Sequence, residues 1–74
     1  MDSSPSRIYW VVGKAVRAQR DKARLSQERL AEKAGLTRNY VVDVERAEKK
    51  ITLEALARIA KALKCRVRDF LRDA

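Results

Sequence analysis

Histidine is absent from the 74-residue sequence, and cysteine occurs only once. An ordinary zinc site takes ligands from several cysteines and histidines, and a disulfide needs two cysteines, so this chain alone can build neither. Catalytic signatures are equally sparse, because the sequence has no activated cysteine neighbourhood, no Gly-rich phosphate loop and no cluster of carboxylates in a plausible cleft. We therefore expect no enzyme, no metal site, no cofactor and no small-molecule ligand.

Long apolar runs are also missing. No run approaches the roughly 18 residues of a membrane-spanning helix, and the polar residues 1–6 lack the apolar core of a signal peptide. We therefore expect a cytoplasmic protein. Hydrophobic residues make up 46% of the chain, which is ordinary for a globular domain. The length has room for one domain, which we place at residues 6–74, after a disordered tail over residues 1–5.

Negative charge is in short supply. Lys and Arg number 18 against 10 Asp and Glu, so the formal net charge is +8 at pH 7. A chain this basic favours a polyanionic partner such as nucleic acid.

Glycine and proline, which interrupt helices, occur only twice and once. Apolar residues recur at spacings of three and four, so the sequence predicts an all-α fold, a compact bundle of five helices. The helices are expected at residues 6–22, 27–34, 37–46 and 52–63 and from about residue 67. Their N-caps are expected at Ser6, Ser26, Thr37 and Thr52. The apolar stripe of the fourth helix is expected to contain Leu53, Leu56, Ile59, Ala60 and Leu63.

The second and third helices, separated by a short turn that contains Gly35, form a helix-turn-helix over about residues 27–46. Once Val41 and Val44 face the core, the outer face of the third helix presents Arg38, Asn39, Val42 and Asp43, with Tyr40 partly to the side. Arginine can chelate guanine, asparagine can chelate adenine, and aspartate can accept a hydrogen bond from cytosine. The pattern fits a DNA-reading helix, although periodicity alone is equally compatible with an ordinary solvated helix face.

A resemblance to the Cro/phage-repressor (XRE) type helix-turn-helix is carried by residues 26–31 (SQERLA), 34–36 (AGL) and 40–46 (YVVDVER). Residues 35–41 (GLTRNYV), followed by VER, are more similar to the controller proteins of bacterial restriction–modification systems. The resemblance covers about residues 12–72. It implies a lambda-repressor-like domain of bacterial or phage origin, a homodimeric transcription regulator that binds double-stranded DNA in the nucleoid.

The resemblance also implies roles for individual residues. The side chains implied to read bases are Arg38, Asn39, Tyr40, Asp43 and Arg46. Those implied to meet phosphates are Gln27, Thr37, Lys49 and Lys50. Arg20 of the first helix is implied to pair with Glu45 in a structural salt bridge, because a carboxylate pointing at DNA would be repelled.

The related proteins dimerise through their carboxyl-terminal end. The corresponding interface residues here are Val67, Phe70 and Leu71, which together with Ile59 or Leu63 offer more apolar surface than so short a chain readily uses. A symmetric dimer places two recognition helices about 34 Å apart, one turn of B-DNA, and implies a pseudo-palindromic operator.

The sequence departs from the family pattern at three places. Arg24 and Ala47 stand where glycine is usual, so either those turns differ or some stability is given up to a left-handed backbone. Val42 with Asp43 is the third departure: valine can touch a thymine methyl, and Asp43 would lie close to phosphates unless it meets a cytosine or an arginine. The operator sequence is therefore not implied.

Three further side chains have two interpretations each. Cys65 is expected to be a half-buried filler, with a redox role as the alternative. Tyr9 and Trp10 are expected to cover one end of the core, with a base-stacking platform as the alternative. For the whole chain, the alternative function is a protein-interaction module of the same fold, such as an antitoxin, with DNA binding secondary.

Overall fold

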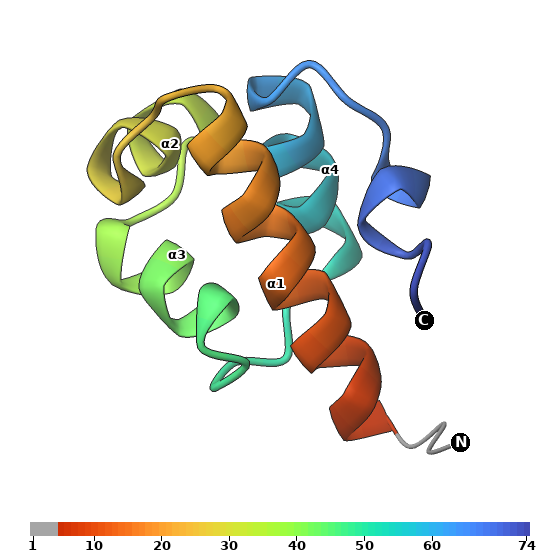
Figure 1. Ribbon diagram of the computed structural model, residues 1–74. Coiled ribbons are helices and arrows are strands. Elements are labelled where there is room, and N and C mark those ends of the chain that lie inside the picture. Colours follow the sequence, from red (N-terminus) through yellow and green to blue (C-terminus); the bar gives the residue numbers. More distant parts are fainter. Residues whose placement is uncertain (1–4) are drawn as a thin grey trace.

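Helices and short connections make up the computed structural model, which describes residues 5–74 (Figure 1). The elements are α1 (Pro5–Lys22), α2 (Gln27–Ala34), α3 (Arg38–Glu45), α4 (Leu53–Ala62) and the 3-10 helix η1 (Val67–Phe70). The all-α class is therefore confirmed over this range. Within residues 5–74, no helix combines the length and the apolar character needed to span a membrane.

The amino-terminal boundary differs from the prediction. Helix α1 begins at Pro5, so Ser6 lies inside the first turn and its predicted role as N-cap is wrong. Proline is tolerated at this position because the first amides of a helix have no acceptor within it. Of the tail predicted at residues 1–5, residues 1–4 lie outside the described residues, and Pro5 belongs to α1.

The other three predicted N-caps, Ser26, Thr37 and Thr52, are confirmed. Each hydroxyl accepts a hydrogen bond from the backbone N–H three residues later, at 3.0, 3.1 and 3.0 Å. These bonds satisfy amides that have no acceptor within the helix. The beginnings of α2, α3 and α4 are thus set by residues next to them in the chain.

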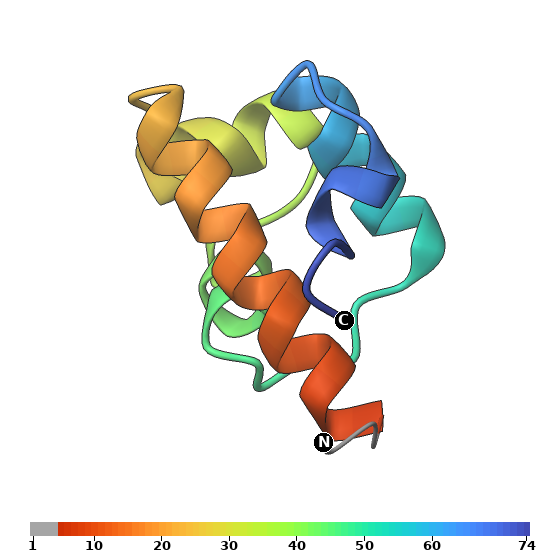
Figure 2. The same ribbon diagram turned by 45° about the vertical axis from the view of Figure 1, so that its right-hand side comes forward.

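The core lies where the four α-helices meet, and η1 closes it on the side of α1 and α4 (Figure 2). Its buried residues are Val12, Val16, Leu30, Ala31, Ala34, Val41, Val44, Leu56, Ile59, Ala60 and Phe70. Phe70 is 0% exposed and is the largest of the fully buried side chains. The 3-10 helix η1 therefore contributes the largest fully buried side chain of the core.

In the carboxyl-terminal half, the short helix predicted from about residue 67 is present, whereas the assignment of Leu53 needs correction. The fifth helix is a single 3-10 turn, in which the Asp69 carboxylate accepts a hydrogen bond from the Arg66 N–H at 2.9 Å. That bond lowers the pKa of Asp69. Leu53 is 82% exposed, so its assignment to the apolar stripe is wrong. As the first residue of α4 it points back toward the helix start, past the packed face.

Gly13 marks the closest approach of two helices. It is buried in the middle of α1 where that helix crosses the end of α3. A Cβ at this position would overlap the carbonyl oxygen of Val44 and lie 3.2 Å from that of Glu45. The two backbones can pack this closely only because residue 13 has no side chain.

We expect Gly13→Ala to lower the free energy of unfolding by about 1–3 kcal/mol, because the methyl group forces α1 away from α3. The loss should occur even though alanine favours a helix over glycine by about 1 kcal/mol. Urea unfolding followed by circular dichroism measures it. Ala18→Gly, at an exposed position of α1, is the control: it should show that glycine elsewhere in this helix is unfavourable. A more stable Gly13→Ala variant would contradict the close approach.

Three non-glycine residues adopt a left-handed backbone: Arg24 (φ 59°), Ala47 (φ 58°) and Lys64 (φ 57°). For Arg24 and Ala47, the sequence left open whether the turns differ from the family pattern or keep it at a cost in stability. The turns keep the left-handed conformation that glycine usually provides. Such a conformation costs an L-residue roughly 1–2 kcal/mol. The free energy of unfolding is therefore lower than it would be with glycine at each of these turns.

Ala47→Gly is expected to raise the free energy of unfolding by about 1 kcal/mol, because glycine relieves the left-handed strain. The same chemical change at Ala57, an exposed position within α4, should lower it by about 1 kcal/mol. Denaturant midpoints of the two variants should therefore move in opposite directions. A parallel decrease would mean that Ala47 makes packing contacts worth more than its strain.

Candidate nucleic-acid interface

The turn between α2 and α3 is built from local signals. Gly35 adopts φ 69° and ψ 32°, a left-handed conformation that suits a residue without a Cβ. The Leu36 N–H then donates to the Ala31 carbonyl at 2.8 Å, which closes the end of α2. Thr37 caps α3 immediately afterwards. The left-handed Gly35, the hydrogen bond from Leu36 and the cap at Thr37 together set the angle between the two helices.

Helix α3 has one buried face and one solvent face. Val41 and Val44 are 0% and 2% exposed and anchor the helix to the core. On the opposite side, Arg38 and Asn39 are exposed and Asp43 is half-buried. None of these three side chains makes a hydrogen bond or ion pair with another residue of the described range 5–74. Their donors and acceptors are therefore available to a partner.

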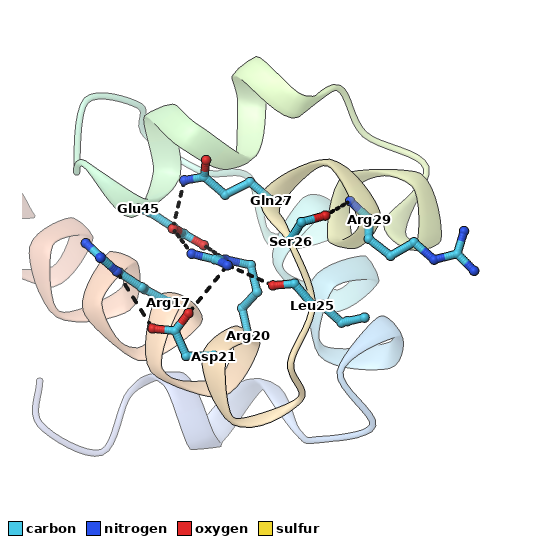
Figure 3. Close-up of polar contacts among 8 residues, drawn as sticks. All are labelled: Arg17, Arg20, Asp21, Leu25, Ser26, Gln27, Arg29 and Glu45. Carbon is cyan, nitrogen blue, oxygen red and sulfur yellow. Dashed lines mark hydrogen bonds and ion pairs between the residues drawn. The ribbon is translucent and has the colours of Figure 1, made fainter.

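An ion pair locks α1 against the end of α3 (Figure 3). The Arg20 guanidinium donates from Nε to Glu45 Oε2 at 2.6 Å and from Nη2 to Glu45 Oε1 at 3.1 Å. Arg20 Nη1 also donates to the Leu25 carbonyl oxygen at 2.8 Å. The two side chains are only 11% and 4% exposed. The hydrogen bond to Glu45 raises the pKa of Arg20 further above its already high value.

Gln27 joins this pair, which the sequence did not indicate. Its Nε2 donates to Glu45 Oε1 at 3.1 Å, a contact between residues 18 positions apart in the chain. No periodicity or cap pattern marks such a contact, because it depends on how α1, α2 and α3 meet. One amide N–H of Gln27 is thus engaged, and the other is left for the phosphate contact predicted for this residue.

The loop after α3 carries the predicted phosphate-binding lysines. Lys50 is exposed, and the Lys49 Nζ lies 5.0 Å from the centroid of the Tyr40 ring. The Tyr40 hydroxyl accepts a hydrogen bond from the Thr52 N–H at 3.4 Å. Tyr40 therefore contacts the loop at its middle, through Lys49, and at its end, through Thr52. Arg46 is exposed, with a long 3.9 Å ion pair to Glu48.

The predicted dimer surface at the carboxyl terminus is only partly available. Phe70 is completely buried in the chain's own core, so its assignment to the interface is corrected. The reason is that η1 folds back against α1 and α4 and turns this side chain inward. Val67 is half-buried against the core, and Leu71 is 39% exposed.

Cys65 is a free, half-buried thiol that packs against the core. Burial, with a smaller contribution from the Asp69 carboxylate, raises the pKa of this thiol. A thiol that stays protonated at neutral pH is a poor nucleophile. These facts agree with the interpretation of Cys65 as a filler.

Trp10 does not cover the core as expected. Its side chain is 50% exposed, whereas Tyr9 is half-buried. The Lys14 Nζ lies 5.3 Å, and the Arg7 Cζ 6.0 Å, from the centroid of an indole ring that faces solvent.

Comparison with known proteins gives a consistent result. A family model described as helix-turn-helix matches residues 16–70, which contain the unit from α2 to α3 and the loop after it. Control protein C.SmaI of Serratia marcescens is 44% identical over 64 residues, covering 86% of this chain and 76% of that protein. Control protein C.BamHI of Bacillus amyloliquefaciens is 37% identical over 65 residues, covering 86% of this chain and 80% of that protein.

Solved structures of regulatory proteins have the same fold as this chain. The restriction-modification controller protein C.AhdI from Aeromonas hydrophila superposes with a TM-score of 0.82 at 35% identity, covering 84% of this chain and 94% of that one. The clp gene regulator ClgR from Corynebacterium glutamicum superposes with a TM-score of 0.83 at 30% identity, covering 86% of this chain and 68% of that one.

Proposed function

This chain belongs to the helix-turn-helix family, and we propose that it regulates transcription by reading a specific sequence of double-stranded DNA with α3. It acts as a homodimer on a pseudo-palindromic operator in the cytoplasm of a bacterium. Since relatives of this length are control proteins, the regulatory target we propose is the promoter of a restriction–modification system.

The observation that carries this proposal is the unpaired outer face of α3. Arg38 and Asn39 stand side by side in the first turn, exposed and without partners among residues 5–74. This is the part of a recognition helix that reaches base edges in the major groove. Arg38 fits a guanine, and Asn39 fits an adenine. Asp43, one turn further along the helix, fits a cytosine amino group.

Phosphate contacts flank this face on both sides. Gln27 and Thr37 lie at the amino ends of α2 and α3, where unpaired amides and the helix dipole favour an anion. Lys49 and Lys50 lie in the loop that follows the other end of α3. Phosphate contacts of this kind set the position and orientation of a recognition helix, while base contacts give specificity.

A randomised duplex pool, selected over several rounds at about 150 mM salt, tests the proposed function directly. Recovery of a pseudo-palindrome with half-sites near one helical turn apart is the expected result. Sedimentation of the protein as a dimer at tens of micromolar should accompany it. If only sequence-independent, salt-sensitive binding emerged, the reading of specific bases by α3 would be excluded.

Arg38→Ala is expected to weaken binding to the selected site by about 1–3 kcal/mol and to relax the preference at one base position of each half-site. Competition among duplexes that differ at single positions measures both effects. Arg58→Ala removes an equal charge from the exposed surface of α4 and should leave every base preference unchanged. A uniform loss across all sequences for Arg38→Ala would make this residue a phosphate contact.

A further inference from the structure

Trp10 is a large apolar side chain that the fold leaves half in solvent. It is the sole tryptophan of the chain, and it is 50% exposed. The indole N–H makes no hydrogen bond with any other residue of the described part of the chain. Lys14 places its ammonium group 5.3 Å from the ring centroid. An exposed aromatic side chain with a free donor and an adjacent cation is suited to contact an anionic partner.

The surface around Trp10 adjoins the loop that follows α3. Residues Ser6, Arg7, Trp10 and Ala47 line one open cavity of about 410 Å³. Figures 1 and 2 both show this loop passing beside the first half of α1. The same loop carries Lys49 and Lys50, which are proposed to meet phosphates. The Trp10 surface is therefore continuous with the proposed DNA-binding surface.

We propose that Trp10 and Lys14 bind the sugar–phosphate backbone of duplex DNA beside the bases that α3 reads. This inference rests on the proposed function and extends its footprint to α1. The Lys14 ammonium and the Trp10 N–H donate to phosphate oxygens, and the ring packs against deoxyribose. No base has to leave the stack, because the backbone of an intact duplex presents sugars and phosphates only.

Charge favours DNA over a second copy of the chain as the partner that binds the surface around Trp10. A symmetric contact through Trp10 would bring Arg7 and Lys14 of both copies together in one interface. Like charges that face each other across an interface oppose association. The net charge of +8 adds to this repulsion, whereas it attracts a polyanion.

The sole tryptophan allows contact and binding to be measured separately. Anisotropy of a dye-labelled duplex carrying the selected site reports binding, and acrylamide quenching of tryptophan emission reports the exposure of Trp10. At saturation we expect the quenching constant to fall by about half or more, because the exposed part of Trp10 becomes covered. Binding with unchanged quenching would overturn this inference and leave the proposed function intact. Absence of specific binding would instead overturn the proposed function.

Lys14→Gln provides a second test that does not depend on the indole. It should reduce the salt dependence of operator affinity by about one phosphate contact per protomer and leave the base preference unchanged. Lys61→Gln, at an exposed position of α4, is the matched control and should change neither. Equal effects of the two variants would overturn the assignment of Lys14.

Two results would assign the Trp10 surface to another partner and overturn the proposal. If polyglutamate protects Trp10 from acrylamide as well as the duplex does at equal charge concentration, the surface recognises acidic polypeptides. If protection rises with protein concentration in the absence of DNA, the surface is an interface between copies of this chain.

Discussion

Replacing Arg20 with alanine is expected to lower the free energy of unfolding by about 3–5 kcal/mol. The Glu45 carboxylate, 4% exposed, would lose the two hydrogen bonds that Arg20 donates. The Leu25 carbonyl would lose a hydrogen bond as well. Small domains have total stabilities near the lower end of about 5–15 kcal/mol, so this loss is most of what holds the domain folded.

Three variants separate this structural role from a direct contact with DNA. Arg17→Ala is the control, because it removes an arginine from the same helix whose side chain is 68% exposed and whose ion pair with Asp21 is long, at 3.9 Å. It should change stability by less than about 0.5 kcal/mol. The double variant Arg20→Met with Glu45→Leu should recover much of the loss, because no buried charge remains. An Arg20→Ala protein that is fully stable yet no longer binds DNA would make Arg20 a DNA contact.

Operator affinity is expected to fall by roughly 10³–10⁵-fold between 50 and 200 mM salt if the dimer neutralises about six to ten phosphates. Each neutralised phosphate releases condensed counterions, and this release is less favourable when salt is already abundant. Equilibrium titration of a labelled duplex at several KCl concentrations measures the slope of log affinity against log salt concentration.

Lys50→Gln isolates one such contact. Lys50 is exposed in the loop after α3, and its loss should reduce the magnitude of the slope by about 0.9 for each protomer. The specificity for the selected site over random duplex should stay the same, because a phosphate contact carries no sequence information. A salt-independent affinity in the unmodified protein would mean that phosphate contacts do not drive binding.

Much of the helix-turn-helix could be predicted because its signals are local. The hydroxyls of Ser26, Thr37 and Thr52 cap the next turn of the chain, and Gly35 provides its own left-handed backbone. A bond that reaches three residues along the chain depends on those residues alone. Val41 and Val44 follow from the same logic, because helical spacing decides which face is apolar.

Other predictions failed because they concern how helices meet. Sequence spacing marked Phe70 as spare apolar surface and Leu53 as core, but η1 turns Phe70 inward and the start of α4 leaves Leu53 outside. Gly13 passed unnoticed, since its importance comes from the carbonyl oxygens of another helix. The bond from Gln27 to Glu45 was missed for the same reason.

The sequence alone therefore determined the all-α class, most helix limits and the side chains that α3 presents, because caps, turns and periodicity act over a few residues. The tertiary structure alone decided which apolar residues are buried, which polar groups are already paired and which surfaces adjoin. Trp10 shows the difference: its place in α1 follows from the chain, but its position beside the loop after α3 follows from packing. Contacts between distant segments depend on the crossing of whole helices, which no short window of sequence encodes.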